Sequence, residues 1–532
     1  MSQAPGDAHT ISTTVAAGYA FTGPALELGG LMTSATDLTD VRVRIPLAML
    51  NRHGLVAGAT GTGKTKTLQL LAEQLSAAGV PVFAADVKGD LSGLSVPGVE
   101  SPKVVERAAS VGQQWQATGH PVELYAIGGE GTGIPLRVTM TAFGPVLLSK
   151  VLGLNDTQES SLGLVFHYAD QAGLPLLDLA DLREVVKHLT SDEGKADLKD
   201  LGGLSSATAG VILRELVGLE ASGGDVFFGE PEFESADLLR TTADGRGVIS
   251  LVELPRLQDR PAIFSTFLMW LLADLFHDLP EVGDVEQPKL VFFFDEAHLL
   301  FNDASKAFLD SIAQTVRLIR SKGVGVFFVT QSPTDVPDAV LAQLGSRVQH
   351  QLRAATPNDA KALKQTVATY PHSAYDDLGR VILSLGIGEA IVTVMDERGA
   401  PTPVAWTRLR APQSLMAPAD AAAMEASVTA SPLHAKYAVA VDRESAREIL
   451  AGKLEAGAEK ARAEQEAPAT DTPEDRIRRE GERATRPRSG SRPRARQQKS
   501  VAEQVMGSTA FKQVVRTAAR EIVRGMFRTG RR

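Results

Sequence analysis

Residues 53–65 read HGLVAGATGTGKT, and this stretch decides the fold. Four of its residues fill the P-loop pattern of glycine, four residues, glycine, lysine and then serine or threonine: Gly58, Gly63, Lys64 and Thr65. A short apolar run at 54–57 precedes the loop, and good helix formers at 67–74 follow it. The stretch therefore predicts a strand, a glycine-rich loop and a helix, in that order.

This loop is suited to holding phosphate. Glycines let backbone N–H groups converge on an anion without a Cβ in the way, and the helix N-terminus adds partial positive charge. Lys64 is expected to reach the β- and γ-phosphates of ATP, and the Thr65 hydroxyl to bind Mg2+. The alternative is a glycine-rich turn with a stray lysine, but the flanking strand and helix favour a nucleotide. The predicted nucleotide contacts are Gly58, Ala59, Thr60, Gly61, Thr62, Gly63, Lys64, Thr65 and Thr67.

A second motif supplies the carboxylates that hydrolysis needs. Four hydrophobic residues at 291–294 lead into Asp295 and Glu296, the pattern of a Walker B strand. Asp295 is expected to hold Mg2+ through water beside Thr65. Glu296 is expected to act as general base toward an attacking water. An apolar run ending in two acids is usually only a strand end, but its place after a P-loop makes it informative.

Further polar residues are predicted at strand and helix ends. Gln331 ends the strand predicted at 323–331, which makes it a candidate sensor or water-positioning residue; the alternative is a glutamine in the turn before Pro333. The candidates for an arginine finger that reaches a neighbouring subunit are Arg320 first, then Arg317, Arg347 and Arg353. Arginines at a helix C-terminus are favourable in any case.

The strand predicted at 80–86 ends in Asp86, and Asp90 follows it, at the edge of the sheet where ligands bind in open α/β folds. Asp86 and Asp90 have two interpretations of equal weight. They contact metal-bound water or a neighbouring subunit, or they cap a turn.

Composition bounds the remaining possibilities. The 532 residues exceed one ordinary core, and 43% hydrophobic with 5% aromatic residues fits an aliphatic-rich α/β protein. The absence of cysteine excludes disulfides, thiolate zinc sites and cysteine nucleophiles. The sequence starts without a basic and apolar leader, and its longest nearly apolar run, 262–276, is too short to span a bilayer. We therefore expect a cytoplasmic protein.

Charge is distributed unevenly. The net charge is −9, but residues 476–532 hold 17 Lys and Arg against 4 Asp and Glu, a net of +13 that leaves −22 for the rest. A basic tail on an acidic body favours an anionic partner, which is nucleic acid, an anionic membrane or an acidic protein surface. The alternative is a tail that folds back on the acidic body.

The alternation of predicted strands and helices indicates an α/β fold with a doubly wound, mostly parallel sheet. A largely helical insertion divides the sheet into two halves, and its helix near 157–171 is expected to begin at Asp156 or Thr157 as cap. The predicted organisation is a short N-terminal segment (1–45), the first half of the ATPase core (46–142), the helical insertion (143–245), the second half (246–410), a helical segment (411–470), a disordered Arg/Pro-rich linker (471–499) and a basic amphipathic helix (500–532).

Together these motifs resemble the HerA/FtsK superfamily of P-loop ATPases, and specifically the bacterial HerA-like proteins with a helicase HerA-like C-terminal domain. The matching stretches are NRHGLVAGATGTGKT (51–65), VFAADVKGDLSG (82–93), LNDTQE (154–159), LVFFFDEAH (290–298), RLIRSKGVGVFFVTQSPTDVP (317–337) and SRVQHQLRAATPNDAKAL (346–363). The resemblance implies a RecA-like core, ATP and Mg2+, a homo-oligomer that is often a hexameric ring, Gln331 as sensor and Arg320 as finger.

The sequence also departs from that family. The archaeal HerA translocases carry an N-terminal β-barrel, which 45 residues cannot build in full, and their partner nuclease has no counterpart in this chain. Residues 295–298 spell the DEAH box of another helicase superfamily, but the Ser-Ala-Thr motif those proteins need after it stands before it, at 206–208. His298 is therefore expected to be a packing residue.

The sequence leaves three hypotheses. The first is an ATP-driven motor on DNA; the second is an ATPase switch or scaffold that acts on a protein or membrane partner. The third, a P-loop kinase, is disfavoured because Glu296 and Gln331 suit water as the phosphoryl acceptor.

Overall fold

The computed structural model describes residues 8–127, 131–198, 202–254, 261–283, 285–301, 306–371 and 373–466. The linker predicted at 471–499 and the amphipathic helix predicted at 500–532 lie outside these residues. The chain divides into two compact units, Met1–Arg443 and Glu444–Arg532. In the second unit the described residues form one long helix, α17 (Ala446–Glu466).

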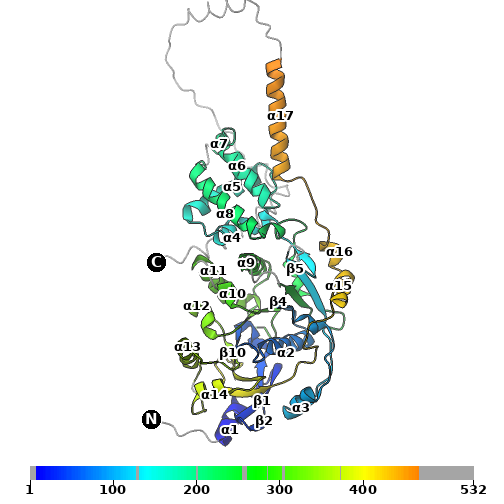
Figure 1. Cartoon of the computed structure of the whole chain (residues 1–532), viewed down its shortest axis with the longest axis vertical. Coiled ribbons are helices and arrows are strands. Elements are labelled where there is room, and N and C mark those ends of the chain that lie inside the picture. Colours follow the sequence, from blue (N-terminus) through cyan, green and yellow to red (C-terminus); the bar gives the residue numbers. More distant parts are fainter. Residues whose placement is uncertain are drawn as a thin grey trace, which may run out of the picture. The chain divides into compact units, whose positions relative to one another are not determined.

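In the first unit the described strands form one twelve-stranded sheet, in the order β2-β1-β12-β11-β10-β3-β9-β8-β4-β7-β5-β6 (Figure 1). The strands from β10 to β6 in this order are all parallel. They are β10 (Ser346–Gln349), β3 (Gly54–Ala57), β9 (Val324–Thr330), β8 (Leu290–Phe294), β4 (Val82–Asp86), β7 (Ile249–Glu253), β5 (Val122–Ile127) and β6 (Ile134–Leu136). The predicted mostly parallel α/β sheet is confirmed.

The other edge of the sheet is antiparallel. It contains β2 (Asp37–Pro46), β1 (Ala25–Ser34), β12 (Ala405–Leu409) and β11 (Glu389–Thr393). The N-terminal segment therefore joins the main sheet, because β1 pairs with β12 nearly 380 residues later in the chain. No sequence pattern within residues 1–45 identifies β12 as the strand with which β1 pairs.

The central strands are buried on both faces, as parallel strands covered by helices must be. Every residue of β3, β4, β8 and β9 is buried. The strand order also places β9 between β3 and β8, so the strand that precedes Gln331 separates the P-loop strand from the Walker B strand. This is the arrangement of a RecA-like core.

Helices connect and cover these strands. They are α1 (Ala8–Gly18), α2 (Lys64–Ala77), α3 (Pro102–Ser110), α9 (Pro261–Asp278), α10 (His298–Phe301), α11 (Lys306–Ile319), α12 (Asp338–Leu341), α13 (Pro357–Ala368), α14 (Leu378–Ser384), α15 (Ala421–Ala430) and α16 (His434–Tyr437). The P-loop helix α2 packs against β3, β9 and β4. Among the described helices, none combines the length and the apolar character needed to cross a bilayer.

Between β6 and β7 the chain forms a group of helices that pack on one another. They are α4 (Met140–Val151), α5 (Asp156–Gln171), α6 (Leu179–Thr190), α7 (Gly194–Asp197) and α8 (Ser206–Ala221). The predicted cap, Asp156 or Thr157, is wrong by one or two residues. Asn155 caps α5 through a capping box with Gln158, because the asparagine oxygen reaches the N–H groups of the first turn.

Candidate active site

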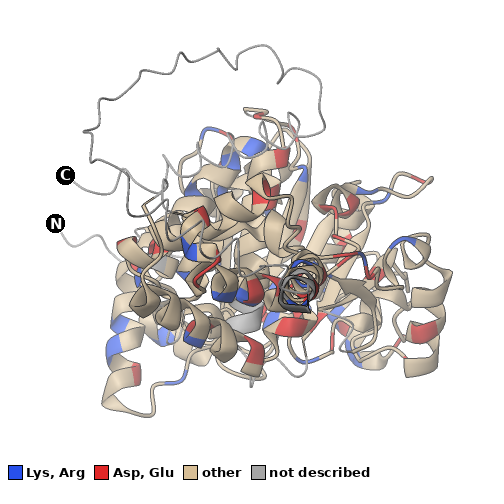
Figure 2. Ribbon diagram, turned by 90° about the horizontal axis from the view of Figure 1, so that it is seen from above, with Lys and Arg blue, Asp and Glu red and all other residues tan. Residues whose placement is uncertain are grey.

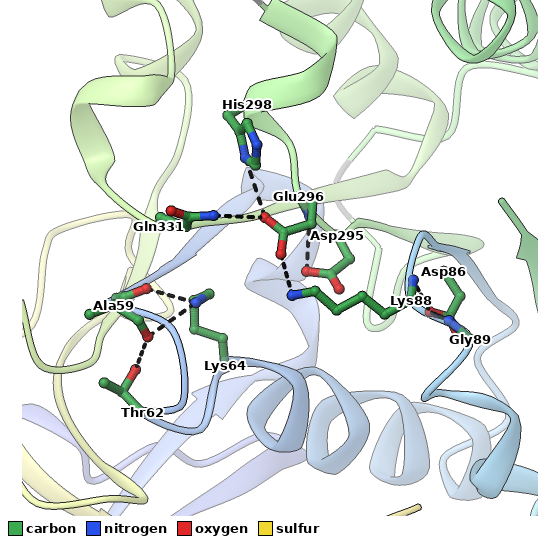
Figure 3. Close-up of polar contacts among 11 residues, drawn as sticks. Ala59, Thr62, Lys64, Asp86, Lys88, Gly89, Asp295, Glu296, His298 and Gln331 are labelled. Atoms are coloured by element: carbon green, nitrogen blue, oxygen red, sulfur yellow. Dashed lines mark hydrogen bonds and ion pairs between the residues drawn. The ribbon is translucent and has the colours of Figure 1, made fainter. Parts of the chain in front are cut away.

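The predicted site residues meet at the carboxyl edge of the parallel strands. Ala57 at the end of β3 pairs with Thr330 of β9, and Phe294 at the end of β8 pairs with Phe328 of β9 and Ala85 of β4. These registers place the ends of the four strands beside one another. The P-loop, the Asp86–Lys88 turn, the Asp295–Glu296 pair and Gln331 therefore face one region, as ligand sites in open α/β sheets do (Figure 3).

The P-loop is held to the sheet by its backbone. Gly58 N donates to Thr330 O at 3.2 Å, and Ala59 N donates to Gln351 O at 2.8 Å. Gly63 caps α2 with φ at 116°, a conformation that favours glycine, and the loop then enters the helix at Lys64. The backbone at the start of α2 is therefore set to bind an anion.

Lys64 folds back over this loop. Its Nζ donates to Gly58 O at 2.7 Å and to Ala59 O at 3.2 Å (Figure 3). Burial lowers the pKa of Lys64, while the negative charge of Glu296 opposes that change. The ammonium group thus lies between the loop and the carboxylates, where a phosphate chain can replace the two carbonyls as its partner.

A buried contact between His350 and Thr67 supports the loop, and no sequence pattern predicted it. His350, directly after β10, contacts the Thr67 hydroxyl through Nε2 at 2.9 Å. A Cβ at Gly58 would lie 2.5 Å from His350 Cβ, so the glycine is required for this close packing. Burial lowers the pKa of His350 to about 4, which keeps the imidazole neutral next to Lys64.

This arrangement changes the interpretation of Thr67. Its side chain is only 1% exposed and its hydroxyl is directed to His350. We therefore propose that Thr67 supports the loop from below rather than contacting the nucleotide. The half-buried Thr65, on the first turn of α2, keeps its predicted role toward Mg2+ as a proposal.

Glu296 is the centre of the polar contacts in this site. Its Oε1 forms an ion pair with Lys88 Nζ, its Oε2 accepts a hydrogen bond from Gln331 Nε2 at 3.4 Å, and His298 Nδ1 lies 3.3 Å from the same Oε2 (Figure 3). The backbone of Glu296 has φ at 48°, a left-handed conformation that costs free energy in a residue with a Cβ. Such strain often accompanies a functional position.

The charge state of Glu296 follows from these contacts. Burial raises the pKa of Glu296, but the hydrogen bond and positive charge of Lys88 outweigh burial and lower it overall. The carboxylate is therefore ionised and can accept a proton. Lys88 itself has a raised pKa: burial opposes its charged form, but its hydrogen bond and attraction to Glu296 dominate.

Asp295 fits the predicted role toward a cation. The side chain is 2% exposed; Oδ1 accepts a hydrogen bond from Glu296 N at 2.9 Å, whereas the buried Oδ2 has no hydrogen-bond partner among the described residues. Burial and, second, the charge of Glu296 raise the pKa of Asp295 to about 7. A cation would supply the missing partner for Oδ2 and favour the ionised form.

The type of cation follows from the donor set. Within the described ranges, no group of three or more His, Asp or Glu side chains is arranged to hold a metal. Mg2+ binds through one or two protein ligands together with phosphate oxygens and water, so Asp295 and Thr65 fit it. They do not fit a metal that needs a complete protein cage.

The structure distinguishes the two interpretations of Asp86. Its Oδ1 accepts from Lys88 N at 3.1 Å and Gly89 N at 2.8 Å, and its Oδ2 accepts from Leu91 N at 2.7 Å (Figure 3). Asp86 therefore caps the turn after β4, and this turn carries Lys88 to Glu296. The role of Asp90 as a contact of metal-bound water or a neighbour remains a prediction.

The arginine candidates lie at different places. Arg320 is exposed in the turn before β9 (the 3-10 helix Arg320–Lys322), at the amino edge of the sheet, while Gln331 follows the carboxyl end of the same strand. The seven residues of β9 span about 20 Å, so Arg320 is remote from the P-loop of its own chain. The exposed Arg353 instead lies beside its own P-loop, with Nη2 3.5 Å from Thr60 O.

Arg347 and Arg317 are the two remaining candidates for the arginine finger. Arg347 contacts Thr369 within its own chain, with its guanidinium over the Tyr370 ring, and Arg317 is exposed near the end of α11. Arg347 is thus engaged inside its own subunit. Arg320 as the arginine that acts on a different copy of the chain stays a prediction.

Replacing Lys88 with methionine is expected to move the acidic limb of the pH–rate profile for ATP hydrolysis to higher pH. Without its ion pair, burial dominates and the pKa of Glu296 rises, so the base is ionised only at higher pH. Rates at saturating ATP and Mg2+ between pH 5.5 and about 8.5 measure this shift. Activity should fall more at the acidic end than at the alkaline end.

A matched control for this variant is Lys103→Met, which removes an exposed lysine from α3 and should leave the profile unchanged. A Lys88→Met profile with the wild-type acidic limb would show that Lys88 does not set the ionisation of Glu296.

Comparison with known proteins adds an independent finding. A family model described as "Helicase HerA-like C-terminal" matches residues 32–532. The DNA double-strand break repair helicase HerA of Sulfolobus acidocaldarius is 22% identical over 362 residues, which cover 66% of this chain and 64% of that protein. The match therefore spans less than two thirds of that relative.

Two solved structures are similar to this chain over most of its length. The bacterial conjugative coupling protein TrwBΔN70 has a TM-score of 0.49 at 15% identity, covering 76% of this chain and 94% of its own. VirB4 of Thermoanaerobacter pseudethanolicus has a TM-score of 0.46 at 15% identity, covering 73% and 97%. Both TM-scores are below 0.5, so no residue role is carried over from them.

Proposed function

Because the chain belongs to the helicase HerA-like C-terminal family, we propose that it is a Mg2+-dependent ATPase that works as a homo-oligomer. The observation that carries this proposal is the position of Glu296. A buried, ionised carboxylate at the end of the Walker B strand faces the P-loop lysine across the edge of the sheet. That pairing suits hydrolysis rather than transfer to a second substrate.

In this mechanism the protein residues bind ATP, position the water and accept its proton. The P-loop N–H groups and Lys64 bind the phosphates, and Gln331 orients a water beside Glu296. Glu296 accepts the proton of that water as its oxygen attacks the γ-phosphorus; the bond to the β–γ bridging oxygen breaks, giving ADP and phosphate. Mg2+, held by Thr65 and Asp295, would neutralise negative charge on the phosphates.

The place of Arg320 supports an oligomer. If Arg320 acts on a nucleotide, an arginine at the amino edge of one subunit reaches the carboxyl edge of another copy rather than its own. We propose a closed ring, with six subunits as the expected number, in which Arg320 stabilises negative charge on the neighbour's phosphates.

DNA is the proposed substrate of the motor. The archaeal relative is described as a DNA repair helicase, and the basic tail at 476–532 has a net charge of +13. In the described residues Lys and Arg are interspersed with Asp and Glu along the ribbon (Figure 2). The strongest electrostatic attraction for DNA is therefore expected from the tail.

The second candidate function is an ATPase switch or scaffold without translocation. The same tail favours it, since a basic amphipathic segment also suits an anionic membrane or an acidic protein surface. In that case ATP binding, rather than movement along DNA, would control the partner.

Duplex DNA is expected to stimulate ATP hydrolysis by the full-length chain several-fold at low salt, with the stimulation weakening as salt increases. A chain that ends before Pro473 should need more DNA for half-maximal stimulation but reach the same maximal rate, because the tail contributes attraction rather than chemistry. Steady-state hydrolysis against DNA concentration at two salt concentrations tests both statements.

Hydrolysis that does not respond to DNA at low salt would contradict the motor and leave the switch as the proposed function. The mass in solution with and without nucleotide tests the ring separately.

A further inference from the structure

A second surface reaches the P-loop from the antiparallel side of the sheet. Strand β11 runs antiparallel to β10, with Gln349 opposite Ile391, so the chain enters β11 at the edge where β10 and β3 end. Residues 385–388, called here the 385–388 turn, connect α14 to β11. Topology therefore places this turn beside the phosphate loop, on the side away from Asp295 and Glu296.

The 385–388 turn is bonded directly to the P-loop and to its surroundings. Gly388 N donates to Thr62 O at 3.2 Å. Arg107 from α3 donates to Gly388 O at 3.1 Å and to Ile387 O at 2.9 Å, and Gly386 N donates to Glu389 Oε2 at 2.9 Å. These contacts hold the backbone of the turn at a defined position.

Two aliphatic side chains on this turn and on the helix before it are exposed to solvent. Ile387 is 75% exposed and Leu383, near the end of α14, is 37% exposed. Gln351 links Leu383 to the loop, since its Nε2 donates to Leu383 O at 2.9 Å and its own carbonyl accepts from Ala59 N at 2.8 Å. Single exposed apolar residues are common on surfaces, but here Ile387 directly precedes Gly388, which is bonded to the phosphate loop, and Leu383 is linked to that loop through Gln351.

The two sides of the P-loop thus differ in chemistry. On the β8 side lie the charged groups of Asp295, Glu296 and Lys88, which suit phosphates, a cation and water. On the β10–β11 side lie the aliphatic side chains of Ile387 and Leu383, near the guanidinium groups of Arg107 and Arg353. In a nucleotide, the ribose separates the base from the phosphates. The flat faces of a base are commonly bound by apolar side chains.

We propose that Ile387, with Leu383, forms the surface on which the base of the bound nucleotide packs. The inference rests on the proposed nucleotide site and adds a surface for the base to the loop that binds the phosphates. The 385–388 turn supplies contact area for the base, while the P-loop supplies the phosphate contacts. The turn's bonds to Thr62 and Arg107 fix the distance between the two halves.

Replacing Ile387 with serine tests this inference through two probes that differ only in having a nucleoside. In titration calorimetry of the full-length chain with Mg2+, Ile387→Ser should weaken ADP binding about tenfold, because the base loses an apolar partner. Binding of inorganic pyrophosphate should not change. Ile387→Leu should retain the affinity for ADP, because leucine keeps an apolar side chain in contact with the base.

The matched control is Val439→Ser. Val439 is 78% exposed and follows α16, which packs near β6 at the other end of the sheet, so this variant should leave the binding of both probes unchanged. Lys64→Ala should weaken both probes, since both contain the phosphates that the P-loop holds.

Several outcomes would overturn the inference. Equal weakening of ADP and pyrophosphate by Ile387→Ser would show that the turn only supports the P-loop, and no weakening of either would place the base elsewhere. Unchanged ADP binding with a reduced mass in solution would make Ile387 a contact between copies. Failure of the unmodified chain to bind either probe would instead contradict the proposed function itself.

Discussion

Replacing Glu296 with glutamine is expected to slow ATP hydrolysis by about 10²- to 10⁴-fold, the usual contribution of a general base. Glutamine has nearly the same shape, and its one amide oxygen can still accept a hydrogen bond from Lys88 or Gln331, which donate to different oxygens of Glu296. Its amide cannot take the proton of the attacking water. Lys64 and Asp295 are untouched, so ATP affinity should stay close to that of the unmodified chain. Phosphate release at saturating ATP and equilibrium ATP binding measure the two quantities.

The control for this variant is another buried carboxylate at the same edge. Glu253 ends β7, and burial followed by the charge of Asp86 raises its pKa to about 7. Glu253→Gln removes a partly protonated group that is not among the contacts of Glu296, so hydrolysis should change little. Normal turnover by Glu296→Gln would remove Glu296 from the role of base and with it the proposed mechanism.

Replacing Arg320 with alanine is expected to reduce hydrolysis by about 10³-fold, the scale of an arginine that stabilises phosphoryl-transfer charge. The strand between Arg320 and Gln331 makes action on its own nucleotide impossible without unfolding of the sheet. The loss should therefore appear only where neighbouring subunits complete the site. Steady-state hydrolysis at a protein concentration that sustains the oligomer measures it.

Mixing two inactive variants distinguishes action between subunits from action within one. An Arg320→Ala subunit keeps its P-loop, and a Lys64→Ala subunit keeps its Arg320, so a mixture should recover part of the activity at shared interfaces. Arg317→Ala, an exposed arginine of the preceding helix, is the matched control and should retain most of the activity. A mixture as inactive as its components would contradict the proposed role of Arg320.

The parts of the site that could be predicted from the sequence are those encoded by short spacings. The P-loop requires its glycines, Lys64 and Thr65 within eight consecutive residues, and the Walker B pattern requires an apolar strand directly before Asp295 and Glu296. Alternating apolar runs and helical patterns also predicted the mostly parallel sheet, which the strand order confirms. In each case the physical requirement acts between neighbours in the chain.

Other features were missed because they depend on residues far apart in the sequence. Lys88 and Glu296 are separated by 208 residues, and Thr67 and His350 by 283. A lysine after a strand, or a histidine among polar residues, has no local pattern that reveals its partner. Only the pairing of β4 with β8 and of β3 with β10 brings these side chains together.

The sequence by itself determined that the chain has a phosphate loop, a Walker B strand and an α/β sheet, since local spacing and periodicity encode all three. The tertiary structure decided which charge faces Glu296, that the Thr67 hydroxyl contacts His350 and that Arg320 lies at the opposite edge from its own P-loop. It also decided that the N-terminal strands join the main sheet and that Ile387 lies beside the phosphate loop. Strand order sets these relations, and strand order is a property of long-range pairing that no local stretch contains.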